Sequence, residues 1–194
     1  MIHRLKYGNT NCFVIDGNNG CLMIDTDMPG TLNGLYRSLK EHEIAFKDIR
    51  FLVATHFHPD HIGLVSELMS KGIRLILLEE QIPYVHFADR IFERDGNISY
   101  EPIKEDTAMI VSCSKSRELL TALGFDGEII YTPSHSMDSI SLIMDDGTCF
   151  AGDLEPIEYL EAYENNELKN DWDKIMEHNP RKVYFSHRNE IIFG

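Results

Sequence analysis

The stretch ATHFHPDHIG, residues 54–63, places three histidines and an aspartate within six positions, directly after strand-forming residues. The apolar run over 49–54 predicts a strand, and the apolar positions after the stretch predict a helix that ends near Gly72. Neutral imidazole and carboxylate are ligands that zinc accepts. The aspartate alone could act as a helix N-cap, but three histidines beside it favour a metal site on this strand-to-helix loop.

The spacing within this stretch predicts parts of two metal sites. His56 and His58 are two positions apart, so in an extended turn their side chains can point the same way. Asp60 and His61 can then face an adjacent point. The four side chains therefore exceed what a single ion needs from one loop.

Strand and helix patterns alternate along the rest of the chain. We predict two hairpins, the first turning at residues 17–20 and the second at Asp146 and Gly147. The other predicted elements are helices over 31–42 and 118–123, strands over 73–78, 109–113, 128–132 and 183–186, and a helical stretch around Trp172. This alternation favours layered sheets covered by helices and leaves the strand order open.

Length and charge narrow the class of protein. A chain of 194 residues suits one domain over residues 1–194. The 32 acidic and 18 basic residues give a net charge of −14, which argues against nucleic acid or anionic lipid as a partner.

No segment has the roughly 20 apolar residues of a membrane span, and the N-terminus has no apolar signal, so we expect a cytoplasmic protein. The four cysteines suit reduced, buried thiols.

Four motifs resemble those of one family. THFHPDH at 55–61 resembles the HxHxDH signature of the metallo-β-lactamase-fold hydrolases, in which it occupies the loop after a strand. TPSHS at 132–136 and FSH at 185–187 resemble the stretches that carry the family's later histidines, and FAGD at 150–153 resembles that of its aspartate. The motifs follow the family's order from about residue 10 to the end. The resemblance implies an α/β fold, the four-layer αβ/βα sandwich of the metallo-β-lactamase type.

The same resemblance implies a ligand set for two divalent metal ions. One ion would be held by His56, His58 and His135, the other by Asp60, His61 and His187, and Asp153 would bridge the two. Zinc is our preferred ion, with iron or manganese as alternatives, because no thiolate is present to select zinc. A hydroxide would lie between the ions, and Asp60 is the candidate catalytic residue, accepting a hydrogen bond from the attacking water.

The predicted reaction is hydrolysis of a small-molecule ester, thioester, lactone or phosphoester, and the motifs do not choose among these. Two other interpretations stay open: a persulfide dioxygenase of the same fold with a single iron, and a metal-binding sensor without turnover. The expected partner is a small-molecule substrate, and a homodimer stays open.

Two features near the motifs also stay open. Residues 81–107, rich in aromatic and charged side chains, could form a substrate lid or a core helix. Asp138, three positions after His135, could orient a ligating imidazole or cap its own turn.

Overall fold

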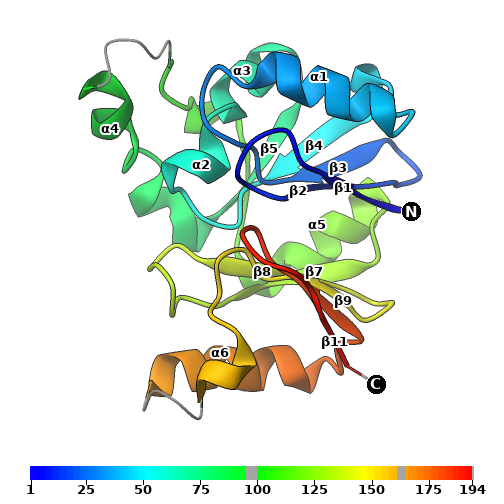
Figure 1. Ribbon diagram of the computed structural model, residues 1–194, viewed down its shortest axis with the longest axis vertical. Helices are drawn as coiled ribbons and strands as arrows, with labels where there is room; N and C mark the ends of the chain where they lie inside the picture. Colours follow the sequence, from blue (N-terminus) through cyan, green and yellow to red (C-terminus); the bar gives the residue numbers. More distant parts are fainter. Residues whose placement is uncertain (95–99, 161–164, 194) are drawn as a thin grey trace.

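A computed structural model describes residues 1–94, 100–160 and 165–193, and its strands form two sheets that lie face to face (Figure 1). The first sheet, in the order β1-β2-β3-β4-β5-β6, consists of β1 (Ile2–Leu5), β2 (Cys12–Ile15), β3 (Cys21–Ile24), β4 (Ile49–Val53), β5 (Arg74–Leu78) and β6 (Met109–Val111). The second sheet, in the order β11-β10-β9-β8-β7, consists of β7 (Gly127–Tyr131), β8 (Ile140–Met144), β9 (Thr148–Phe150), β10 (Lys182–Tyr184) and β11 (Ile191–Ile192).

The first sheet changes from antiparallel to parallel pairing at β3. β1, β2 and β3 pair antiparallel, whereas β3, β4, β5 and β6 pair parallel. Parallel strands need cover on both faces, and the strands at the middle of this sheet are almost wholly apolar and buried. Helices α1 (Leu32–Glu41), α2 (Pro59–Ile62) and α3 (Val65–Ser70) pack on the outer face through their apolar side chains (Figure 1).

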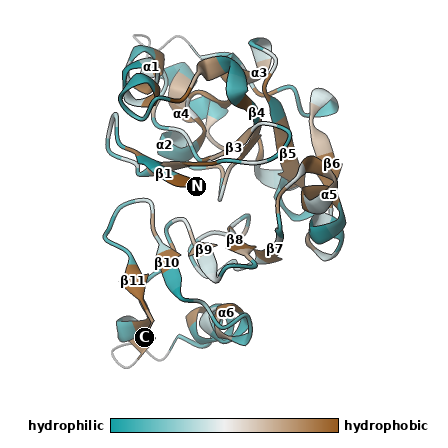
Figure 2. Ribbon diagram, turned by 90° about the vertical axis from the view of Figure 1, so that its right-hand side faces the viewer, coloured by the Kyte–Doolittle hydropathy of each residue, from teal (hydrophilic) through white to brown (hydrophobic). Residues whose placement is uncertain are grey.

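The second sheet is covered on its outer face by α6 (Asn166–Glu177) (Figure 1). The helix begins because the side chain of Asn165 accepts hydrogen bonds from the backbone N–H groups of Glu167 and Leu168. Trp172 and Ile175 on its inner face are buried against strands β8, β9 and β10. Its outer residues are mostly hydrophilic, as are those of α1 on the opposite side of the molecule (Figure 2).

The inner faces of the two sheets share a core that joins them. Phe13 of the first sheet meets Phe150 of the second with ring centroids 5.0 Å apart. Helix α5 (Ser116–Leu123), in the connection between the sheets, adds Leu120 and Leu123 to this core. The order of layers is helix, sheet, sheet, helix, which confirms the predicted four-layer sandwich.

The structure confirms both predicted hairpins and adds strands that the pattern did not predict. β2 and β3 pair across residues 17–20, and β8 and β9 pair across the turn at Asp146 and Gly147. The missed strands are β1 and β11, one of which is partly polar and the other two residues long. Cys12, Cys21 and Cys149 are buried free thiols as predicted, whereas Cys113 is only half-buried.

Residues 81–107 form neither a simple lid nor one core helix. They contain α4 (Asp89–Arg94), preceded by a 3-10 helix over Glu79–Tyr84 and followed by another over Glu105–Thr107. Within this segment Val85 and Phe92 are buried, whereas Phe87 is 59% exposed. Residues 95–99 lie outside the described part. No helix in the described ranges is long and apolar enough to cross a membrane.

Candidate metal centre

Four loops bring the candidate ligands together, and each loop follows a strand. After β4, His56 and His58 lie in the loop, and Asp60 and His61 lie in the short helix α2 that follows it. The loops after β7, β9 and β10 carry His135, Asp153 and His187. The first loop belongs to one sheet and the other three belong to the second sheet. The centre therefore lies where the two sheets meet, and both sheets must be in place to form it.

Contacts within the protein hold the backbone of the HPDH segment in place. Pro59 is at the first helical position of α2, where its missing N–H costs no hydrogen bond. Thr10 donates its hydroxyl to the Asp60 carbonyl at 2.8 Å, and the Thr26 N–H donates to the His61 carbonyl at 2.9 Å. These contacts hold the loop against the β1–β2 and β3–α1 connections, so its side chains are aimed by the fold.

The seven candidate ligands fall into three overlapping groups. Within each group one ligand atom per residue lies within 4.8 Å of the others. The groups are His56, His58 and His135; His56, His61 and Asp153; and Asp60, His61 and His187. The first and third correspond to the two predicted ligand triads, and the second shares a member with each.

Asp153 lies between the two triads. Its Oδ2 is 3.7 Å from His135 Nε2, 3.9 Å from His56 Nε2 and 3.4 Å from His61 Nε2. Its Oδ1 is 3.5 Å from His187 Nε2. One carboxylate therefore reaches ligands of both triads, which is the position that a bridging ligand requires.

Unsatisfied polar atoms show that the centre fits a metal ion. Among the described residues, Nε2 of His56, Nε2 of His61 and Oδ1 of Asp153 are buried without a hydrogen-bond partner. A buried polar atom without a partner costs about 1–3 kcal/mol, so three of them in one cluster need an explanation. Imidazole nitrogen and carboxylate oxygen are donors for zinc, iron and manganese. The residues present fit such ions.

Burial and neighbouring charges shift the pKa values of three candidate ligands. Burial lowers the pKa of His56 well below its usual range, and the neighbouring imidazoles lower it further. Burial also acts to lower the pKa of His61, but the carboxylates of Asp25 and Asp153 outweigh it and raise that pKa to about 10. Burial acts to raise the pKa of Asp153, yet His61 holds it below its usual value. His56 therefore presents a free nitrogen lone pair, whereas His61 is paired with carboxylates.

Asp25 supports the centre from behind, and the sequence patterns did not reveal it. Its Oδ1 accepts the Thr55 N–H at 2.6 Å, and its Oδ2 accepts the hydroxyls of Thr55 at 2.8 Å and Ser186 at 3.2 Å. The same Oδ2 is 3.0 Å from His61 Nδ1, which leaves His61 Nε2 to face the centre. A ligating histidine commonly has such a carboxylate on its second nitrogen.

The loops from the second sheet have their own supports. Asp171 of α6 accepts the Ser134 N–H at 2.7 Å, next to His135. Asn11 is not a candidate ligand. Its side-chain amide donates to the carbonyls of Phe185 at 3.1 Å and Arg188 at 3.3 Å, on either side of His187. Helix α6 and the β1–β2 connection thus position the two histidines.

Gly152 allows the Asp153 loop to approach the HxHxDH loop. It has a φ of +57°, and an added Cβ would lie 2.6 Å from the Thr55 hydroxyl oxygen. A side chain here would push the loops apart as well as strain the backbone. The close approach of the two loops and the positive φ therefore explain why FAGD has a glycine at this position.

Asp138 fits neither of the two roles considered for it. Its Oδ2 accepts the backbone N–H of Phe57 at 2.5 Å, so it orients the HxHxDH loop through the backbone between two histidines. Among the described residues it makes no hydrogen bond or ion pair with the imidazole of a candidate ligand. Its carbonyl meanwhile accepts the amide of Gln81 at 3.1 Å, linking it to the segment after β5.

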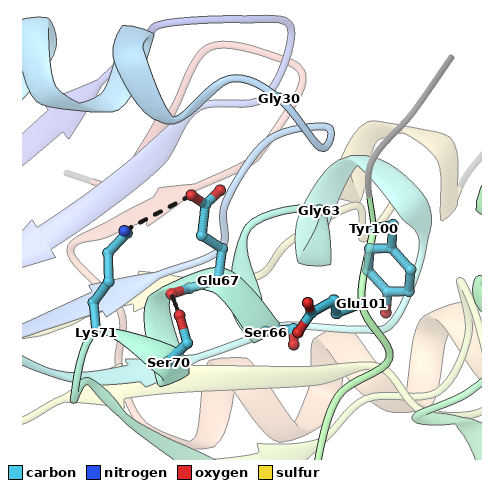
Figure 3. Close-up of a pocket in the computed structure, with 8 residues that line it drawn as sticks. All are labelled: Gly30, Gly63, Ser66, Glu67, Ser70, Lys71, Tyr100 and Glu101. Carbon is cyan, nitrogen blue, oxygen red and sulfur yellow. Dashed lines mark hydrogen bonds and ion pairs between the residues drawn. The ribbon is translucent and has the colours of Figure 1, made fainter.

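A separate hollow lies on the outer side of the HxHxDH segment. It has a volume of about 370 Å³ and lies between α3 and the chain at Tyr100 and Glu101, with Gly63 in its lining (Figure 3). The Glu67–Lys71 ion pair lies along one side. None of the seven candidate ligands lines it, so it is not the mouth of the metal centre.

Comparison with known proteins identifies the family of the chain. Residues 5–187 match the family described as the metallo-beta-lactamase superfamily. A beta-lactamase-like protein 2 homolog of Drosophila melanogaster is 24% identical over 191 residues, covering 94% of this chain and 59% of the relative. A protein of Methanocaldococcus jannaschii named a probable metallo-hydrolase is 31% identical over 149 residues, covering 74% of this chain and 67% of the relative. The chain thus spans about three fifths of the first of these relatives.

Solved structures show the same fold. A metallo-beta-lactamase family protein of Thermus thermophilus superposes with a TM-score of 0.73 at 19% identity, covering 98% of this chain and 74% of that one. The BLEG-1 B3 metallo-beta-lactamase superposes with a TM-score of 0.72 at 21% identity, covering 99% of this chain and 94% of that one. The protein TTHA1623, solved in a di-iron-bound form, superposes with a TM-score of 0.70 at 18% identity, covering 99% of this chain and 94% of that one. From its matching motifs, its fold and its family match, this chain belongs to the metallo-β-lactamase superfamily.

Proposed function

We propose that the protein is a hydrolase that uses two divalent metal ions to cleave a small-molecule ester, thioester, lactone or phosphoester. The observation that carries the proposal is the position of Asp153 between two three-residue ligand groups, beside unpartnered nitrogens of His56 and His61. Superfamily membership and the relative named a probable metallo-hydrolase support it. When bound, two such ions supply Lewis acidity and make water a nucleophile near neutral pH.

The protein's own groups have distinct tasks in this proposal. Asp153 offers one carboxylate to both halves of the centre, which offsets the repulsion between two dications at short range. Asp60 has Oδ2 3.0 Å from His187 Nε2 and a side chain one-third exposed, so a carboxylate oxygen is accessible from the solvent side. We propose that Asp60 accepts a hydrogen bond from the attacking water and directs it at the substrate.

The metal content tests the proposal first. We expect protein purified without chelator or affinity metal to contain close to two ions per chain, because seven candidate ligands exceed what one tetrahedral ion uses. Zinc remains our preferred ion, and iron or manganese fit the same donors. Elemental analysis of the purified protein gives both the count and the identity.

A substrate panel on the same sample tests turnover. The panel contains nitrophenyl esters, an aliphatic thioester, a lactone and a nitrophenyl phosphodiester, and we expect at least one to be cleaved in proportion to metal occupancy. Asp153→Asn keeps the shape of the side chain but removes its charge, so we expect loss of metal and of turnover together. Asp145→Asn is the matched control, because Asp145 is exposed and pairs with Arg117 at 2.9 Å.

Three results would contradict the proposal in different ways. Two ions without turnover of any panel member would indicate a metal-binding sensor. A single iron per chain, with oxygen consumption on a persulfide substrate, would indicate the dioxygenase. An Asp153→Asn variant with two ions and parental turnover would remove the bridging role.

A further inference from the structure

Phe87 is an exposed aromatic side chain in contact with a candidate metal ligand. Its ring centroid is 6.1 Å from that of His58, and the rings are tilted by 38°. Single exposed apolar side chains are ordinary on protein surfaces. Phe87 differs because its ring pairs with that of a candidate metal ligand while 59% of the residue is exposed.

The backbone that carries Phe87 is anchored on both sides. Val85 and Ala88 are buried in the core of the first sheet, and the Phe87 N–H donates to the Tyr84 carbonyl at 2.9 Å. His86 bridges two carboxylates, with Nδ1 2.7 Å from Asp89 Oδ2 and Nε2 3.2 Å from Glu105 Oε2. Phe87 is therefore held beside His58 by packing and charge contacts.

A second exposed apolar residue belongs to the loop that carries His135. Met137, two positions after His135, is 56% exposed, and its carbonyl accepts the Tyr131 hydroxyl at 2.6 Å. Phe87 comes from the segment after β5 and Met137 from the loop after β7. Phe87 thus packs on His58 from the segment after β5, and the loop that carries His135 contributes a second exposed apolar residue.

The charged residues beside the other half of the centre pair with each other. Arg188 follows His187, and its guanidinium is 3.3 Å from a carboxylate oxygen of Glu155, two positions after Asp153. A guanidinium already paired with a carboxylate is a poor site for a multiply charged phosphate, and the net charge of −14 also repels such anions. The surroundings favour a substrate with little charge of its own.

We propose that Phe87 and Met137 form an apolar wall that binds the acyl group of the substrate, so that the substrate is an ester, thioester or lactone with an apolar acyl chain. This inference rests on the proposed hydrolase function and specifies its substrate class. In this arrangement Phe87 is a specificity-determining residue. It contacts the substrate chain and leaves the reacting atoms to the metal centre.

Binding of simple carboxylates tests the wall separately from turnover. Acetate, butanoate and hexanoate are titrated calorimetrically into metal-loaded protein, since their carboxylate resembles the product head group and their chains differ only in length. In the parent we expect affinity to rise about two- to fourfold per added methylene. Phe87→Ala should flatten this rise and leave acetate binding within about twofold of the parent, whereas Phe87→Leu should keep most of the rise.

Ile91→Ala is the matched control. Ile91 lies on α4 in the same segment and is exposed to 46%, and unlike Phe87 it carries no aromatic ring that pairs with His58. Its variant should show the parental rise with chain length. Metal content is measured for every variant, so that loss of an ion is not mistaken for loss of the wall.

The outcomes separate the two proposals. A rise with chain length that is equal in parent and Phe87→Ala, or absent from the parent, overturns the wall. Cleavage of the ester panel with no such rise leaves the hydrolase and removes the wall, whereas the rise without cleavage of any panel member leaves the wall and removes the hydrolase. Tighter binding of dimethyl phosphate than of hexanoate would overturn the acyl assignment.

Discussion

Asp25 connects three parts of the chain through one buried carboxylate. It follows β3, and its partners are Thr55 before the first histidine, His61 at the end of the motif, and Ser186 beside His187. Its φ of +57° is in the left-handed region, which aspartate tolerates better than most residues. The carboxylate therefore fixes His61 and also holds the loops of both sheets in register.

Replacing Asp25 by asparagine should weaken metal binding while the fold is retained. The amide has almost the same shape, but its NH₂ cannot accept the hydrogen bonds that one carboxylate oxygen now accepts. Loss of such a support commonly costs about 10–100-fold in metal affinity, and we expect this range for the more weakly held ion. Competition against a chromophoric chelator measures it.

Asp16→Asn is the control for Asp25→Asn. Asp16 also follows a strand of the first hairpin, but its side chain is 44% exposed and pairs with the N-terminal amine at 3.4 Å. Equal metal affinities in parent and Asp25→Asn would show that Asp25 does not orient His61.

The candidate ligands could be picked out from sequence, whereas the residues that support them could not. His56, His58 and His61 stand within six positions, so their shared role is visible in the linear order. Asp25 is 36 positions from its partner His61, and Asn11 is 174 positions from Phe185. Only the tertiary fold makes them neighbours. The strand-end aspartate in CLMID was the available signal, since loops after strands carry the centre.

At the scale of elements, the short helix α2 must approach the chain before α1 very closely. A Cβ added to Gly63, just after α2, would lie 2.3 Å from the Pro29 nitrogen and 2.4 Å from the Asp27 carbonyl oxygen. Both are backbone atoms, which cannot move aside as a flexible side chain can. Gly63 therefore sets the distance between the HxHxDH segment and the loop that supports it.

Gly63→Ala should destabilise the protein and displace the metal ligands. Overpacking of this kind costs about 1–3 kcal/mol, and here the displaced backbone carries Asp60 and His61. Gly72→Ala is the control, because its Cβ meets nothing within 4 Å and only the φ of +92° is strained, at roughly 1–2 kcal/mol. Denaturant unfolding and metal titration should show similar loss of stability in both variants, but loss of metal affinity in Gly63→Ala alone. Parental metal affinity in Gly63→Ala would mean that the loop moves as a unit.

Elements with strong apolar patterns were predictable, and the two edge strands β1 and β11 were not. The buried strands β3, β4 and β5 and the capped helix α6 have continuous or helical apolar patterns. β1 alternates weakly and gains its identity from pairing with β2, and β11 has two residues paired with β10. Their strand structure depends on a neighbour that the local sequence does not reveal. The structure of residues 81–107 could not be predicted for a related reason, because the short helices of this segment carry both buried and exposed aromatic residues.

At the scale of the whole molecule, the apolar clusters that join the layers consist of residues other than the candidate ligands. Three buried apolar clusters hold α1 and α3 to the first sheet, join the two sheets, and hold α6 to the second sheet. None of the seven candidate ligands belongs to a cluster. We therefore expect the layers to form without metal and to bring the candidate ligands together at the edge of the two sheets.

Removing the metal should lower stability without unfolding the sandwich. Each ion present at 100 times its dissociation constant stabilises the native state by about 2.7 kcal/mol, and a protein of this size changes Tm by about 2–4 °C per kcal/mol. Two ions then correspond to a fall of roughly 10–20 °C on chelation. The far-ultraviolet circular dichroism at 25 °C should stay close to that of the loaded protein, because the three apolar clusters are intact. Returning zinc should restore the parental Tm, and Asp153→Asn should show a smaller shift with chelator because it binds metal less well. If chelation instead abolished the circular dichroism signal, metal binding would be required to form the layers, and the separation of core and centre would be wrong.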